Sequence, residues 1–184
     1  MRQSEVSPLE ARFYPSLPFY ISRETKTHSS MPSLHYHDGY EILYIVSGDL
    51  NCLVGDRSYP AVGGVLLAID RNDRHRLTNV TGTPYERVTL LFQREFVAEM
   101  GSAVGELDPL SCFGSGTHAM KLGGGERDFV EGLFRKMIAE HQRQFPGYDA
   151  YRKLLLLELL IFSRRLLDGG RPDPLLETGR VPKR

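Results

Sequence analysis

Three histidines and one glutamate are the residues of this chain whose types and spacing could support metal chemistry. His35 and His37 stand one residue apart in "SLHYHDGYEILYIVSGDL", and Glu41 follows four residues after the second histidine. His75 lies in a later segment of similar character. Three imidazoles and one carboxylate that converged would suit a divalent transition metal such as Zn, Ni, Fe, Mn or Cu, with positions left open for water or substrate.

Convergence of these four side chains depends on which faces of their strands they occupy. Residues two apart share one face of a strand, so regular pairing would place His35, His37 and Glu41 together. By the same parity His75 and Leu77 share a face of a later strand. If both faces point into one barrel, the imidazoles and the carboxylate can meet.

Short β-rich segments between Phe19 and Gln93 would have to position these residues. Runs rich in Val, Ile, Leu and Tyr alternate there with Gly, Asp, Asn and Pro clusters, which is the pattern of short strands and turns. Many short strands with evenly spaced turns indicate a sandwich or a small barrel. We expect strands near 19–23, 34–37, 40–47, 50–54, 57–61, 65–69, 75–80 and 86–93.

Helices are expected after the strands. "REFVAEMG" predicts a short helix near 94–101, and apolar residues spaced three and four apart predict an amphipathic helix over 126–144. A second long helix is expected over 149–168 and is apolar almost all round. Such a helix needs cover on both sides, which burial within one chain or a partner subunit could supply.

The chain divides into four segments by composition. Residues 1–18 contain three prolines and are expected to form an extended arm. Residues 19–122 carry the strands, and residues 125–168 form the two-helix segment. Residues 169–184 are polar and proline-containing, which favours a linker or tail, and we expect the natural chain to continue beyond it.

Composition excludes several classes of protein. The 23 basic and 23 acidic side chains give no basic bias of the kind that nucleic-acid-binding modules carry. No run has the length of a signal peptide core or of a membrane span, so no membrane partner is expected. Only Cys52 and Cys112 are present, without metal-site spacing, which fits a cytoplasmic protein with buried thiols.

Two stretches resemble the paired motifs of cupins. "HYHDGYEILYIVSG" has the first motif's spacing, and "GVLLAIDRNDRHRLTN" has the second motif's spacing, with Gly64, His75 and Asn79 in place. Asp70 and Asn72 replace the usual proline and glycine, which affects turn positions only. The resemblance implies a mostly β chain: a cupin (double-stranded β-helix or jelly-roll) barrel followed by two C-terminal α-helices, α+β overall. It also implies that all four metal-ligand positions are filled.

A narrower resemblance covers nearly the whole chain. The arm, the barrel, "LLFQREFVAEM" and the two helices with their linker are similar to the N-terminal sensor domain of AraC-family transcription regulators. Such proteins bind DNA through a C-terminal helix-turn-helix half, which this chain lacks. The resemblance implies a small-molecule effector, with sugars as one class, and a homodimer that contacts DNA only through the missing domain.

The resemblance also assigns further residues. Ligand contacts on the last long strand make Arg87 and Thr89 candidates beside the histidine and glutamate set, with a rim position as the alternative for Arg87. Across a two-fold axis the 149–168 helix would pair with its symmetry mate. The side chains expected at that dimer contact are Leu155, Leu159, Phe162 and Leu166.

Two functions follow, and the polar set has three possible roles. His35, His37, Glu41 and His75 could line an effector pocket, hold a metal, or form a buried network that only stabilises the barrel. The first function is a non-enzymatic effector-sensing and dimerisation domain of a regulator. The alternative is a metal-dependent cupin enzyme, a dioxygenase or isomerase, that uses the three-His/one-Glu site.

Overall fold

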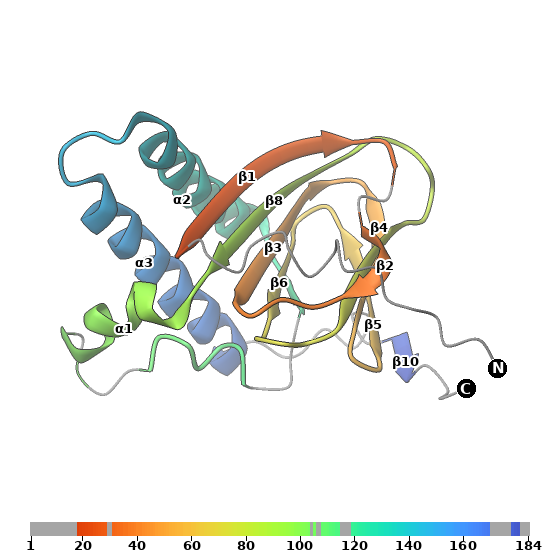
Figure 1. Ribbon diagram of the computed structural model, residues 1–184. Coiled ribbons are helices and arrows are strands. Elements are labelled where there is room, and N and C mark those ends of the chain that lie inside the picture. Colours follow the sequence, from red (N-terminus) through yellow and green to blue (C-terminus); the bar gives the residue numbers. More distant parts are fainter. Residues whose placement is uncertain are drawn as a thin grey trace.

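Two five-stranded antiparallel sheets face each other, and helices cover one of them (Figure 1). The computed structural model describes residues 18–28, 31–103, 105, 108–114, 119–169 and 178–180. The expected arm at 1–18 therefore lies outside the described residues except for Pro18, as does most of the 169–184 tail.

The first sheet has the strand order β1-β8-β3-β6-β9 and the second has the order β10-β5-β4-β7-β2. The first sheet contains β1 (Phe19–Lys26), β8 (Tyr85–Phe92), β3 (Tyr40–Ser47), β6 (Val65–Ile69) and β9 (Ala119–Lys121). The second contains β10 (Thr178–Arg180), β5 (Arg57–Val62), β4 (Asp49–Val54), β7 (His75–Asn79) and β2 (Met31–His35). The chain crosses from one sheet to the other after most strands, in jelly-roll fashion, and stays within one sheet only from β4 to β5 and from β8 to β9. This confirms the predicted cupin-type barrel followed by helices.

Opposite faces of the first sheet serve two different cores. Leu43 and Ile45 of β3 point between the sheets, where they join Cys52 and Leu77 of the second sheet. Tyr44 and its neighbours on the other parity belong to the core beneath the helices. The alternation predicted for this strand is therefore confirmed, and it defines an interior face with odd residue numbers on β3.

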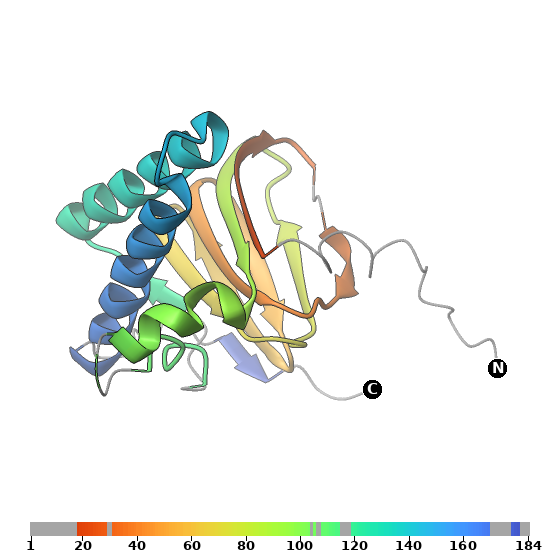
Figure 2. The same cartoon turned by 60° about the vertical axis from the view of Figure 1, so that its left-hand side comes forward.

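The helices form a layer on the outer face of the first sheet (Figure 2). They are α1 (Arg94–Ala103), α2 (Gly124–Arg143) and α3 (Tyr148–Gly169). Among the described residues, no helix combines the length and the apolar character that crossing a membrane requires.

Helix α3 is covered largely by its own chain. Leu155 and Leu159 are 3% and 0% exposed and belong to the core beneath the helices. Phe162 and Leu166 are partly buried and pack against the same core. Much of the apolar surface of α3 is thus buried within the chain itself. Leu155 and Leu159 are therefore not accessible for a contact with a second copy.

Two local features differ from the sequence prediction. The predicted strand at 34–37 ends at His35, so His37 lies in the connection to β3 and not on a strand face. Within the tail, Thr178–Arg180 pairs antiparallel with β5 at the edge of the second sheet. Residues this polar and close to proline gave no strand pattern, and the open edge of β5 supplies the partner.

Candidate functional site

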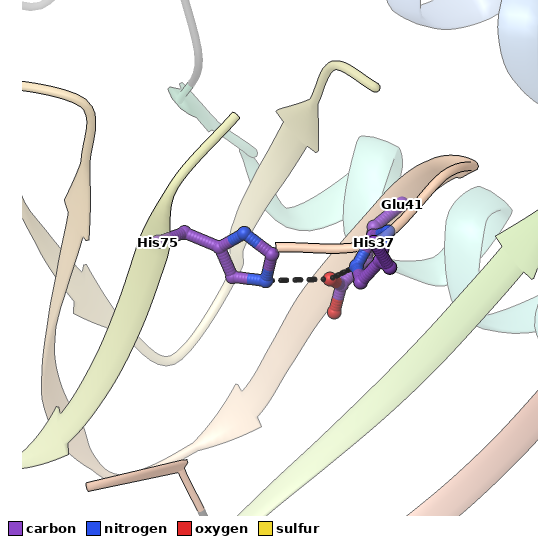
Figure 3. Close-up of side chains that lie close together, drawn as sticks. All are labelled: His37, Glu41 and His75. Atoms are coloured by element: carbon purple, nitrogen blue, oxygen red, sulfur yellow. Dashed lines mark hydrogen bonds and ion pairs between the residues drawn. The ribbon is translucent and has the colours of Figure 1, made fainter. Parts of the chain in front are cut away.

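Three of the predicted side chains meet at one end of the barrel (Figure 3). Glu41 is the second residue of β3 in the first sheet, and His75 is the first residue of β7 in the second. His37 approaches from the connection before β3. Glu41 Oε2 lies 2.8 Å from His37 Nε2 and 3.1 Å from His75 Nε2. Glu41 and His75 are 1% and 2% exposed, so this contact is shielded from bulk water.

Backbone carbonyls fix the orientation of both imidazoles. His37 Nδ1 lies 3.1 Å from the Gly39 oxygen, and His75 Nδ1 lies 2.9 Å from the Asp73 oxygen. A carbonyl oxygen only accepts hydrogen bonds, so each Nδ1 must carry the proton. A neutral ring of this kind would point its Nε2 lone pair at the Glu41 carboxylate, and the two would repel each other. The contact becomes favourable if Nε2 also carries a proton, or if a cation binds between the nitrogen and the carboxylate oxygen.

The geometry of the group fits a metal ion. The ligand atoms of His37, Glu41 and His75 lie within 4.8 Å of one another. Metal–ligand bonds of about 2.0–2.2 Å place neighbouring ligand atoms about 3 Å apart, close to the two separations above. A metal held there would supply a Lewis acid with open positions for water or a ligand.

His35 stands beside this group and does not belong to it. Its ring lies edge-on to His75 with centroids 4.2 Å apart, and its Nδ1 lies 3.2 Å from the Ser33 oxygen. Strand pairing places His35 directly opposite His75. Of the four predicted metal ligands, the structure therefore brings three together.

Charge interactions and burial shift the pKa values of Glu41, His75 and His35. Burial by itself would raise the pKa of Glu41, but His37 and His75 outweigh it and hold that pKa well below its usual range. Burial would lower the pKa of His75, yet Glu41 raises it overall. Burial and the neighbouring His75 lower the pKa of His35. Without a metal, the contacts of the Glu41 carboxylate with the two imidazoles hold the group together.

Arg87 and Thr89 form a second polar group farther along the interior. Both lie on β8 and are 4% exposed, so the rim alternative for Arg87 is wrong. Arg87 pairs with Ile45 and Thr89 pairs with Leu43, which places both on the interior face. Since Ile45 is four residues from Glu41, about 13 Å of strand separates Arg87 from the histidine group.

Glu24 belongs to this second group and was not predicted from the sequence. It is the partner of Arg87 across β1 and β8, with its Oε2 3.6 Å from Arg87 Nη2. The predicted first strand stopped at 23, whereas β1 continues to Lys26. Extending the strand by one residue would have placed Glu24 opposite Arg87 by parity alone.

Comparison with known protein families agrees with this architecture. The model of the family described as the AraC-like ligand binding domain matches residues 17–160. The chain belongs to this family. The AraC-like domain thus includes every strand except β10, the helices α1 and α2, the first part of α3, and both polar groups of the barrel.

Two solved structures of ToxT from Vibrio cholerae resemble the AraC-like domain. One, from strain O395 and bound to (E)-4-(8-methylnaphthalen-1-yl)but-3-enoic acid, has a TM-score of 0.54 at 12% identity, covering 83% of this chain and 58% of that one. The other, an apo variant from strain SCE256, has a TM-score of 0.57 at 12% identity, covering 83% and 57%. The chain thus spans little more than half of either ToxT chain, and the likeness shows the fold alone. No curated protein matches the sequence.

Proposed function

We propose that this chain is the effector-sensing and dimerisation domain of a cytoplasmic AraC-family transcription regulator, and that it binds a small molecule inside the barrel. The observation that supports it most is a set of buried polar atoms on the interior face. Glu41 Oε1, Thr89 Oγ1 and two nitrogens of Arg87 have no hydrogen-bond partner among the described residues. Buried polar groups without partners cost stability, so a ligand that satisfies them would bind favourably.

Effector binding would act through the helices. The first sheet carries Glu41, Arg87 and Thr89 on its interior face and packs against α2 and α3 on the other. A ligand that binds one arrangement of sheet and helices better than another shifts the balance between them. In a full regulator such a shift would change how the paired DNA-binding domains are presented to DNA.

A screen of sugars and organic acids by thermal unfolding and calorimetry tests the ligand site. We expect a binder to stabilise the chain, by about 2.7 kcal/mol at a hundred times its Kd. Thr89→Val, which removes an interior hydroxyl without changing size, should weaken binding about tenfold. Ser111→Ala is the matched control, because Ser111 Oγ is also buried, has no hydrogen-bond partner within the part of the chain that the structure describes, and lies outside the strands. Equal affinity in both variants would place the site outside the barrel.

Dimerisation is proposed on the helical layer, at side chains other than Leu155 and Leu159. Phe129 of α2 and Tyr151 and Leu154 of α3 are large apolar side chains that remain 38–51% exposed. We expect analytical ultracentrifugation to show a dimer at micromolar concentration and Leu154→Glu to shift it towards monomer. A wild-type chain that sediments as a monomer at high concentration would contradict the dimer.

A metal-dependent enzyme is the second candidate, and the His37–Glu41–His75 group is the observation that favours it. An enzyme requires turnover of a substrate that depends on the metal. Near-stoichiometric iron or manganese in the purified protein, lost in His75→Ala together with turnover, would establish that function. Metal without turnover would leave the regulator as the better account.

A further inference from the structure

Arg87 is the most unusual charged residue inside the barrel. It is 4% exposed and lies on the interior face of β8, surrounded by strands on both sides. Its Nε and Nη1 are buried and have no hydrogen-bond partner among the described residues. A guanidinium is always charged and carries five N–H donors, so leaving donors unpaired in the interior is costly.

Glu24 compensates this charge only in part. Glu24 Oε2 lies 3.6 Å from Arg87 Nη2, beyond the usual length of a charge-assisted hydrogen bond. The same oxygen lies 3.1 Å from Lys26 Nζ, so its charge is shared with a second cation. The Glu24 side chain is also 35% exposed, which screens what remains. The positive charge of Arg87 is therefore only partly compensated by the described residues.

The surroundings restrict what could fill it. Thr89 Oγ1, two residues along the same face, is another buried atom without a hydrogen-bond partner in the described part of the chain. The strand positions opposite Arg87 and Thr89 on β3 are Ile45 and Leu43, both in the apolar core between the sheets. A fitting ligand would have a compact anionic group, which accepts hydrogen bonds from the guanidinium and from the Thr89 hydroxyl. The rest of that ligand would be apolar.

We propose that the effector is an organic carboxylate whose carboxyl group binds Arg87 and Thr89, and that Glu24 is the internal counterion it displaces. This inference rests on the proposed function and names a class of effector other than the sugars that the family resemblance offered as one class. A carboxylate matches the guanidinium fork in two parallel hydrogen bonds, whereas a neutral sugar would leave the buried charge uncompensated. Release of Glu24 from Arg87 would remove a side-chain contact between β1 and β8, so that ligand binding would act on β1 at the edge of the first sheet.

Matched acid and amide pairs test the ligand class on the full chain. Benzoate and benzamide, and hexanoate and hexanamide, differ in charge but hardly in shape. By calorimetry we expect each acid to bind at least ten times more tightly than its amide. Arg87→Met should weaken acid binding about a hundredfold, which is typical for loss of a hydrogen-bonded charge.

Glu24→Gln tests the displaced counterion. Removing a competitor for Arg87 should tighten benzoate binding several-fold. Glu86→Gln is the control, because Glu86 neighbours Arg87 in sequence but bonds Arg23 at 2.7 Å on the exposed side. The same gain in both variants would show a general effect of net charge and would overturn the role of Glu24.

The ligand-free protein gives a test that needs no effector. An arginine retained for a ligand should be replaceable by methionine with no loss of melting temperature, or with a gain. A variant Arg87→Met that melts well below the wild type would show a structural arginine and overturn the inference. Sugars or amides that bind as well as the acids would overturn the acid class while leaving effector sensing intact. If no compound of any class bound, the proposed function itself would fail.

Discussion

Replacing Glu41 by alanine should lower the free energy of unfolding by about 3–5 kcal/mol at pH 6, the loss typical of a buried ion pair that keeps only one partner. Glu41 is 1% exposed and faces two imidazoles within 3.1 Å. Without the carboxylate, any proton on His75 Nε2 would be left buried beside no anion. Urea unfolding at fixed ionic strength measures the loss.

The pH dependence of this loss has a defined sign. Folding lowers the pKa of Glu41, so its contribution is present above about pH 4.3 and is lost as pH falls through the lowered pKa. Folding raises the pKa of His75, so its contribution is complete below about pH 6.5 and is lost as pH rises through the raised pKa. In the metal-free domain, the Glu41→Ala penalty should therefore be smaller at pH 8 than at pH 6.

Glu86→Ala is the matched control for Glu41→Ala. Glu86 also bonds a cationic side chain, but its ion pair with Arg23 is accessible to solvent, with side chains 39% and 29% exposed for Arg23 and Glu86. Exposed pairs contribute about 0–1 kcal/mol, so this variant should lose little stability at either pH. If the two alanine variants lost similar amounts, the histidine group would not be a stabilising ion-pair network.

The sequence predicts much of the fold because periodicity and turn residues act locally. The β3 strand has regular alternation between two cores, so parity assigns Glu41, Leu43 and Ile45 to the interior correctly. The spacing of apolar residues likewise predicts α2 within a few residues, and the sequence also places α3 within a residue of its observed ends. These elements have unbroken patterns over at least two turns or four strand positions.

Parity fails where the chain leaves regular structure. It placed His37 on a strand, although the chain turns after His35 and a contact with the Gly39 oxygen orients the His37 ring. Because the chain leaves the strand between the two histidines, His37 contacts Glu41 whereas His35 contacts His75 only ring to ring. Composition also could not show which side of α3 is covered, because a helix that is apolar all round has no pattern that separates its own chain from a partner.

Buried residues linked to a distant segment were equally inaccessible to local patterns. Arg152 of α3 is 7% exposed, bonds Asp149, approaches His141 Nδ1 at 2.9 Å and stacks over Phe19 of β1. It joins α2, α3 and the first sheet at one point. In sequence it resembles any charge on a helix, since only the tertiary contact reveals its burial.

Metal binding should depend strongly on His75 and weakly on His35. His75 Nε2 faces Glu41 directly, whereas His35 contacts His75 only ring to ring. We expect Zn²⁺ or Ni²⁺ affinity to fall at least about a hundredfold in His75→Ala, because a direct ligand contributes more than the tenfold to hundredfold of an outer-shell partner. In His35→Ala the fall should stay within about tenfold.

Calorimetric titration of chelator-treated protein with Zn²⁺ and Ni²⁺ measures these affinities. His141→Ala provides a third histidine variant, since His141 lies on α2 beside Arg152 and outside the barrel. Equal losses in His35→Ala and His75→Ala would show that His35 binds the metal as directly as His75 does. A wild-type chain that took up neither ion at pH 8 would show that the group is an ion-pair network alone.

The sign of the pH dependence also separates these two roles of the histidine group. Protons and metal compete for the same Nε2 atoms, so a metal ion binds more tightly as pH rises. The metal-free group loses stability over that same rise, because His75 sheds the proton that holds it to Glu41. Unfolding measured from pH 6 to pH 8 should therefore show stability falling without Zn²⁺ and rising with it. A regulator with this group would respond to metal most strongly where its own ion pair is weakest.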